Sequence, residues 1–372
     1  MRIAAVVLLI AVASGCAATA PASVVAPSPA VVVAVEPPAP PPVPVAERPE
    51  VVELAPLVPP PVPERRIERR SVYEQAGVTE WTLANGLTVV YLHEPNADVY
   101  RARVQAPTGW VSLPASMRSV FEEGGAATWG GLLASVEPRR RVAVAEAETL
   151  AELVGSVEAL FTRPSDPPVS EAIASAFDRP SDFVVVLSGP VEREWVEPVI
   201  ATALAPLRGR DSEFGPLLET PEPIASASLV AEINAGWDDL PAIVLLSHLL
   251  ADRSGRGDAV RLDFDAPRRV AHALVDPSGA GADVFRPASD DAIRVARTES
   301  ARAAASPEGR ILALAILYEV PGNVRPARPP SDALTLSDRI ERTPPARVVD
   351  LLGRLAQAAV VTAPPPLPSL PE

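Results

Sequence analysis

A hydrolytic metal site in this chain would depend on histidine, and the sequence contains three: His93, His248 and His272. A helical zinc site needs two histidines on one face, as in H-E-x-x-H or H-x-x-E-H. His93 is followed by Glu94 and Pro95, and proline interrupts a helix. The other two histidines have no second histidine within a turn. The spacing therefore predicts no zinc: His93–Glu94 is an exposed strand end, His248 lies on a helix flank and His272 on a strand.

Other catalytic signatures are missing from the sequence as well. It has no G-x-S-x-G elbow, no phosphate loop and no G-x-G-x-x-G motif. The RGD tripeptide at Arg256–Asp258 is typical of a surface turn, and the carboxylate pairs Glu122–Glu123 and Asp290–Asp291 are typical of solvated helices. We therefore expect that the chain is not an enzyme.

Cys16, the one cysteine of the chain, ends a short leader. Arg2 supplies a positive charge, an apolar run follows from Ile3 to Val12, and small residues lead to the cysteine, which is the layout of a signal peptide. The tetrapeptide Ala13-Ser14-Gly15-Cys16 resembles the bacterial lipobox. This resemblance implies cleavage after residue 15 and lipid attachment at Cys16. An ordinary cleaved signal peptide is the alternative.

The lipobox resemblance also implies a location. Ala17, rather than an aspartate, follows the cysteine, which resembles outer-membrane sorting. We therefore expect a lipid-anchored protein of the cell envelope, at the outer membrane and facing the periplasm, that contacts the membrane through its anchor.

Two segments are too rich in proline to bury a face. Residues 16–70 alternate proline with valine and alanine, and proline favours extended polyproline conformation, so we expect a semi-rigid linker. Residues 361–372 form a similar short tail. Plain disorder is the alternative for the linker. The folded body is then expected between 71 and 360.

Hydrophobic periodicity within the body predicts strands and helices in both halves. A hairpin is expected at 81–92 around Asn85-Gly86, and a helix near 150–161 with Leu150, Leu153, Val154, Val157, Leu160 and Phe161 on one face. Further strands are expected at 98–109, 179–191, 226–234 and 269–276, and helices at 192–207, 240–253, 290–305, 309–319 and 345–357. The pattern predicts an α+β fold in which helices pack on largely antiparallel sheets.

Charge excludes one class of partner. The net charge is −14, and all 33 basic residues are arginine. Nucleic-acid binding needs a concentrated positive surface, so no nucleic acid is expected. Electrostatic adhesion to anionic lipid is disfavoured for the same reason.

The order of these segments resembles the insulinase/pitrilysin-like zinc peptidases. The stretch WTLANGLTVVYLHEPNADVYRARVQAPTGW, residues 81–110, is similar to the family's opening turn and two strands. RPSDFVVVLSGPVEREWVEPVIATALAPL, residues 179–207, is similar to its later strand, glycine turn and helix. Residues 145–168 and 334–355 resemble the helix before a proline-rich link and the closing helices.

This resemblance implies a fold of two related α+β units, here 71–220 and a shortened 221–360. Active members carry His-x-x-Glu-His after the first strand pair, where this chain has PASMRSVFEEGGAATWGG at 114–131, without a histidine. No metal ligand is carried over, and no zinc cofactor is expected. Arg261 is similar to the arginine with which active members hold substrate, so it is a possible substrate or partner contact. The matching tyrosine is missing.

The resemblance implies a pseudo-peptidase, that is, a non-catalytic lipoprotein. It would bind a catalytic homologue, with which it would form a chamber, or it would bind a peptide. A periplasmic envelope scaffold unrelated to proteolysis is one alternative. A weakly constrained second half that folds poorly is another, and an active metallopeptidase with an unrecognised site is a third.

Overall fold

The computed structural model describes the folded body and leaves the leader and the proline-rich segments undescribed. The described residues are 59–63, 65–110, 113, 118, 121, 126–129, 131–162, 171–209, 229–254, 260–266, 268–275, 284–319, 326 and 328–361. They belong to one compact unit. Cys16, the predicted linker up to 58 and the predicted tail from 362 lie outside them. Within these ranges, no helix has the length and apolar character needed to cross a membrane.

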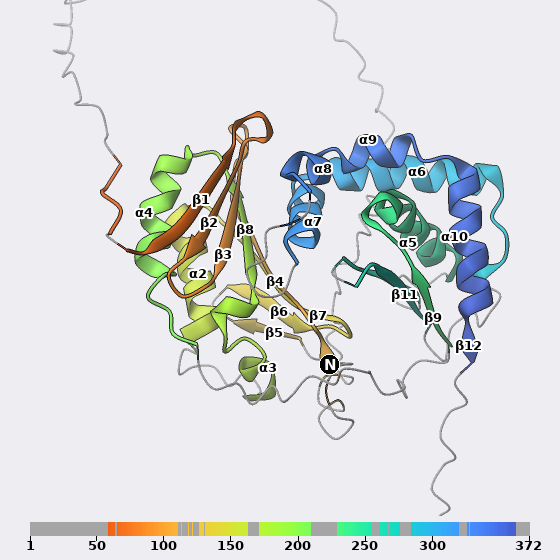
Figure 1. Cartoon of the computed structure of the whole chain (residues 1–372), viewed down its shortest axis with the longest axis horizontal. Helices are drawn as coiled ribbons and strands as arrows, with labels where there is room; N and C mark the ends of the chain where they lie inside the picture. The colour runs from red at the N-terminus through yellow and green to blue at the C-terminus, as the bar shows by residue number, and fades with distance from the viewer. Residues whose placement is uncertain are drawn as a thin grey trace, which may run out of the picture. The chain divides into compact units, whose positions relative to one another are not determined.

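An eight-stranded sheet forms the first half of the body (Figure 1). Its strands are β1 (Ile67–Tyr73), β2 (Val78–Leu83), β3 (Thr88–His93), β4 (Tyr100–Pro107), β5 (Ala126–Trp129), β6 (Leu132–Val136), β7 (Arg140–Ala147) and β8 (Val184–Gly189). The order across the sheet is β1-β2-β3-β8-β4-β7-β6-β5. Every pairing is antiparallel except the parallel one between β3 and β8.

The predicted hairpin at 81–92 is confirmed as β2 and β3. Gly86 has a positive φ of 82°, a conformation that favours glycine. The Asn85 side chain donates to the carbonyls of Leu204 and Leu207, at 2.8 and 3.1 Å. These hydrogen bonds attach the turn to the residues that follow a distant helix. The hairpin therefore holds its place by local turn chemistry and by long-range hydrogen bonds.

Strand β8 is buried on both faces, which explains its uninterrupted apolar run. Val185 and Leu187 belong to one hydrophobic cluster, whereas Val184 and Val186 belong to the other. Neighbouring β3 divides its side chains in the same way. Continuous apolar runs are typical of strands that are covered on both sides.

Helices α2 (Leu150–Thr162) and α4 (Arg193–Ala203) cover one face of this sheet (Figure 1). The short helix α3 (Glu171–Ser175) contributes to the same hydrophobic cluster, and the 3₁₀ turn η3 (Pro180–Asp182) precedes β8. The prediction for the face of α2 is confirmed. Its buried residues are Leu150, Leu153, Val154, Val157, Leu160 and Phe161.

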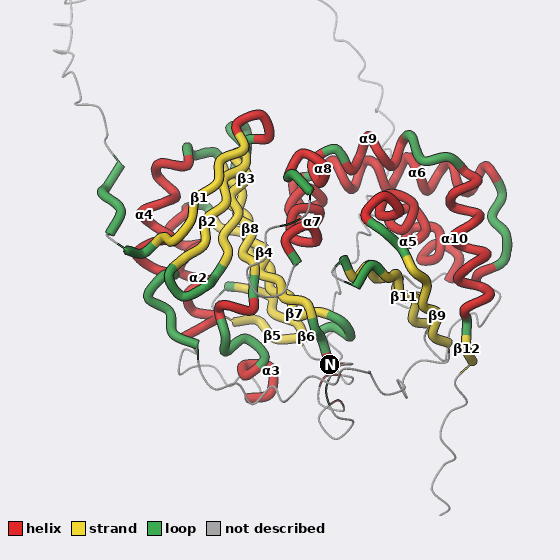
Figure 2. Tube along the Cα trace, viewed as in Figure 1, coloured by secondary structure: helices red, strands yellow, loops and turns green. Residues whose placement is uncertain are grey.

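The second half is mainly helical (Figure 2). A four-stranded antiparallel sheet has the order β10-β11-β9-β12, with β9 (Leu229–Asn234), β10 (Val260–Asp265), β11 (Val270–Val275) and β12 (Val360–Val361). The helices are α5 (Leu240–Ser254), α6 (Asp290–Ala305), α7 (Pro307–Tyr318), α8 (Pro330–Leu334), α9 (Leu336–Glu341) and α10 (Pro345–Ala358). Helix α5 packs against α6, α9, α10 and β10.

Helix α7 joins the two halves because it packs on β8 and β4, on the face opposite α2 and α4. Its side chains are buried nearly all round, as expected for a helix that is apolar on every side. One hydrophobic cluster therefore contains Val90 and Val186 of the large sheet together with Leu314 of α7. The α+β class is confirmed, while the division into related units at 220/221 stays a prediction.

Candidate functional site

The His93–Glu94 pair separates at the end of β3. His93 Nε2 lies 3.1 Å from the carbonyl oxygen of Pro190, and its Nδ1 lies 3.8 Å from Glu192. The Glu94 side chain is 6% exposed and forms an ion pair with Arg310 of α7. The pair is thus a strand end whose two side chains have different partners, and Glu94 is buried rather than exposed as predicted.

His248 and His272 lie on the predicted elements, α5 and β11, and burial lowers the pKa of both. His272 is 1% exposed, and its Nδ1 lies 3.0 Å from a Glu232 carboxylate oxygen. Burial and then Arg139 lower the His272 pKa to about 3, so the ring is neutral at physiological pH.

The three histidines therefore lie on three different elements. In the described ranges, no group of three histidine, cysteine, aspartate or glutamate residues has the arrangement to hold a metal ion. The absence of zinc stays a prediction from the sequence.

Arg261 lies in β10, where its backbone is in register with Leu274 of β11. The structure describes its backbone only, so its expected contact with a substrate or partner also stays a prediction. Cys16 lies outside the described residues.

The structure assembles a set of polar contacts that the sequence did not predict. Four residues of α7 and its C-terminal end pair with the eight-stranded sheet, and we call these contacts the polar seam. The pairs are Glu308 with Arg101, Arg310 with Glu94, Tyr318 with Glu80, and Glu319 with Arg140. Each pair joins residues more than 170 positions apart, so the seam exists only in the folded chain.

Glu80 is the best satisfied carboxylate of the seam. It is 1% exposed and accepts from Arg69 at 2.7 Å, from Tyr318 at 3.3 Å and from Tyr73 at 3.4 Å. Burial and the nearby Glu80 charge raise the pKa of Tyr318 well above its ordinary value. A buried carboxylate with three donors is a rigid structural contact.

Glu319 is a buried carboxylate with one oxygen that lacks a hydrogen-bond partner. It is 3% exposed, its Oε1 lies 3.8 Å from Arg140 Nε, and its Oε2 has no hydrogen-bond partner. Burial raises the pKa of Glu319 to about 7, although Arg140 acts in the opposite direction. A carboxyl group that titrates near neutral pH is typical of functional sites, and of buried structural ones.

Arg140 is shared among several groups. Its Nη2 donates to the carbonyl oxygen of Phe264 in β10 at 3.0 Å, which ties the large sheet to the small one. Asp263 and Glu137 raise its pKa in addition to Glu319. Arg140 therefore gives Glu319 only part of the compensation that a buried anion needs.

A small, partly open pocket with room for about one water-sized group lies at this end of the seam. Gln105, Ser181, Asp182, Tyr318 and Glu319 are among the residues that line it. Gln105 is fully buried, its Oε1 accepts from Arg103 at 2.7 Å, and its Nε2 has no partner by geometry. This pocket is the strongest candidate site on the described part of the chain.

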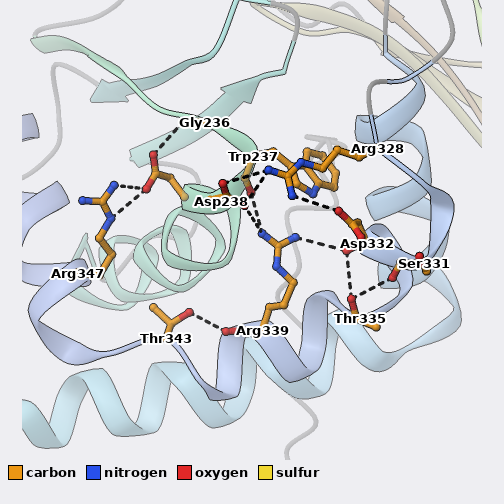
Figure 3. A network of polar contacts seen from close by, with 11 residues as sticks. Gly236, Trp237, Asp238, Arg328, Ser331, Asp332, Thr335, Arg339, Thr343 and Arg347 are labelled. Carbon is orange, nitrogen blue, oxygen red and sulfur yellow. Dashed lines mark hydrogen bonds and ion pairs between the residues drawn. The ribbon is translucent and has the colours of Figure 1, made fainter.

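A second polar network organises the helices of the second half (Figure 3). Arg339 donates to the Trp237 carbonyl at 3.0 Å, and its guanidinium lies 5.9 Å from the centre of the Trp237 ring. Arg347 pairs with Asp239, whose other oxygen accepts from the Gly236 amide at 2.9 Å. The arginines here are already paired, so the network fixes the start of α5 against α8, α9 and α10.

Solved structures of M16 insulinase/pitrilysin-like peptidases, the family that the sequence resembles, are similar to this chain at low identity. The ferredoxin protease FusC, solved with Arabidopsis ferredoxin, is 13% identical with a TM-score of 0.47, over 82% of this chain and 46% of that chain. The periplasmic protease PqqL from Escherichia coli is 12% identical with a TM-score of 0.49, over 78% and 45%.

An M16 inactive domain from Pseudomonas fluorescens is 14% identical with a TM-score of 0.42, over 76% of this chain and 96% of that one. The chain thus spans less than half the length of FusC and PqqL. At these identities the likeness is one of fold alone. No protein-family model and no curated protein matches the sequence.

Proposed function

We propose that this chain is a non-catalytic, insulinase-like protein of the cell envelope that binds an active zinc peptidase of the same fold, or a peptide. The observation that carries the proposal is the placement of its histidines. The sequence holds three, and they lie on three different elements, β3, α5 and β11. A hydrolytic zinc site needs several ligands around one ion to lower the pKa of a bound water.

The sequence resemblance supports the partner role. Residues 114–131, which take the place of the zinc-binding helix, contain no histidine. In the family that the chain resembles, inactive units pair with active ones to enclose a chamber. A chain that keeps the packing residues of this fold but lacks the metal-binding residues could serve as such a subunit, because packing and catalysis depend on different residues.

The leader supports a location in the envelope. Lipid attachment at Cys16 would hold the body at the membrane, and the proline-rich linker would separate the two. Multiple acyl chains are needed for stable anchoring, since one chain alone gives marginal binding.

The test uses the full chain, with an active peptidase of the same fold as a parallel control. Zinc content is measured by elemental analysis, and cleavage is measured on a quenched peptide library with added zinc. We expect no stoichiometric zinc and no cleavage. One zinc per chain together with peptide cleavage would overturn the proposal.

Partner binding is tested separately, by co-expression with a homologue from the same genome that retains His-x-x-Glu-His. We expect the two chains to elute together in size-exclusion chromatography, with a mass that equals their sum. Elution as separate species, together with capture of envelope structural proteins from membranes, would favour the scaffold alternative.

A further inference from the structure

The pocket at the Glu319 end of the polar seam contains a buried acceptor without a donor. Glu319 Oε2 has no hydrogen-bond partner, and the side chain is 3% exposed. An ionised carboxylate oxygen that is removed from water and left unpaired costs free energy. The site is therefore incomplete with the protein's own groups whenever Glu319 is ionised.

The lining of this pocket favours a positively charged occupant. Two carboxylates, Asp182 and Glu319, belong to it, and none of its lining residues is basic. Ser181 also belongs to the lining. Asp182 is 40% exposed and lies 3.6 Å from Arg141, so its charge is compensated from outside the lining. Glu319 is the group that still needs a donor.

The charged side chains around the pocket do not supply a hydrogen-bond donor to Glu319 Oε2. Arg103 of β4, Arg140 of β7 and Asp265 of β10 are the charged groups that face Glu319 from the packed strands. Arg140 is shared with Asp263, Glu137 and the Phe264 carbonyl, and Arg103 donates to Gln105. Gln105, which lines the pocket, also lowers the pKa of Glu319. Neither these arginines nor the Gln105 amide makes a hydrogen bond to Glu319 Oε2 that meets the geometric limits of distance and angle.

The size of the pocket selects among cations. Beyond its open mouth it has room for about one water-sized group. An ammonium group has that size and three donors, whereas a planar guanidinium is larger. We propose that this pocket binds a primary ammonium group, either of a free alkylamine or of a lysine side chain, with Glu319 as its counter-ion. The site goes beyond the proposed partner role and does not depend on it.

The proposal predicts that the affinity for an amine depends on pH. Because burial raises the pKa of Glu319 to about 7, the binding-competent, ionised form is a minor species at pH 6 and the major one at pH 8. Apparent affinity scales with the competent fraction. The affinity for an amine should therefore rise about tenfold from pH 6 to pH 8.

The experiment titrates the full chain with n-butylamine, and separately with N-acetyl-lysine amide, by ligand-observed NMR. n-Butanol and N-acetyl-norleucine amide are the uncharged controls. Both amines are expected to bind if the pocket admits side chains, and n-butylamine alone if it admits only free amines. The uncharged controls should not bind at the same concentrations.

Two variants test the site itself. Glu319→Gln keeps the shape of the side chain and removes its charge, so it should weaken amine binding at least tenfold at pH 8 and abolish the pH dependence. Glu308→Gln removes the same charge from the start of α7, where Glu308 is half exposed, and should leave binding unchanged. Thermal unfolding of both variants checks their folding.

Two results would overturn the proposal. They are equal binding of n-butylamine and n-butanol, and equal affinity of wild type and a folded Glu319→Gln variant. The first comparison uses the wild-type chain, so it decides the question even if Glu319→Gln does not fold.

Discussion

Glu319 and Arg140 form a nearly buried ion pair: the Nε–Oε1 distance is 3.8 Å, and the side chains are 3% and 9% exposed. The pair lies where α7 ends against β7, with the small sheet behind it. Burial dominates the behaviour of the carboxyl group and raises its pKa to about 7, from 4.5 in the absence of the fold.

This pair predicts a pH dependence of stability. The folded-state pKa of Glu319 is raised, so its contribution is fully present below about pH 4.5 and is lost as pH rises to about 7. The free energy of unfolding of wild type should fall relative to Glu319→Gln by about 3 kcal/mol over that window. Urea unfolding at several pH values measures it. Glu308→Gln is the control, and a difference that is flat in pH would contradict the assignment.

A second prediction concerns the other end of the seam. Tyr318→Phe removes the hydrogen bond to Glu80 and should cost about 1 kcal/mol in the free energy of unfolding. In a Glu80→Gln background the same change should cost less, because the charged acceptor has already been removed. A double-mutant cycle by chemical unfolding gives the coupling. Strict additivity would show that the two residues do not interact.

Local patterns were enough to predict the elements that carry a strong period. The six buried residues of α2 follow the 3.6-residue repeat, and the β2–β3 turn has the Asn-Gly signal. Strand β8 was found from an apolar run between turn residues. In each of these segments the residues that decide the structure are neighbours in the sequence.

Elements without such a pattern were missed. Strand β1, IERRSVY, is an edge strand with mostly exposed side chains, and it starts at Ile67, inside the segment predicted to be linker. Strands β5 and β6 were also not predicted, because they are only four and five residues long. Strand β10, VRLDFD, was not predicted either, although it alternates apolar and charged residues as a half-buried strand does. Such strands are specified by the neighbours with which they pair.

The candidate site could not be predicted from the sequence for a related reason. Glu80 and Tyr318 are 238 positions apart, and no local period joins them. One signal was present: the run ILALAILY is apolar on every side of a helix, which indicates full burial, and Glu319 directly follows it. A carboxylate at the end of a buried helix needs a partner, so this signal could have indicated the seam.

The packing of α2 gives a third prediction. Leu153 is fully buried beneath the large sheet, so Leu153→Ala should lower the free energy of unfolding by about 2–5 kcal/mol. Glu152→Ala, one position earlier on the exposed face, should change it by less than about 0.5 kcal/mol. Guanidinium unfolding followed by tryptophan fluorescence compares the two. Equal effects would place the wrong face of α2 against the sheet.

The polar network of the second half predicts different stability effects for two adjacent residues, Asp238 and Asp239 (Figure 3). Asp239 is 12% exposed, caps the Gly236 amide and pairs with Arg347, so Asp239→Ala should cost about 1–2 kcal/mol. Asp238 is 78% exposed and pairs with Arg328, so Asp238→Ala should cost less than about 0.5 kcal/mol. Thermal unfolding of both variants at low and high salt checks this, since salt weakens only the exposed pair appreciably. Similar losses in the two variants would contradict the assigned roles.

The leader supplies the last prediction. If Cys16 carries the lipid, Cys16→Ala should move the protein from the detergent phase to the aqueous phase of a Triton X-114 partition, because the acyl chains are its hold on the membrane. Labelling with a radioactive or alkyne-tagged fatty acid should be lost in the same variant. Ser23→Ala, a small substitution in the adjoining segment, should retain both. Aqueous partition of the wild-type chain would instead favour an ordinary cleaved signal peptide, and the linker would then be a free N-terminal extension.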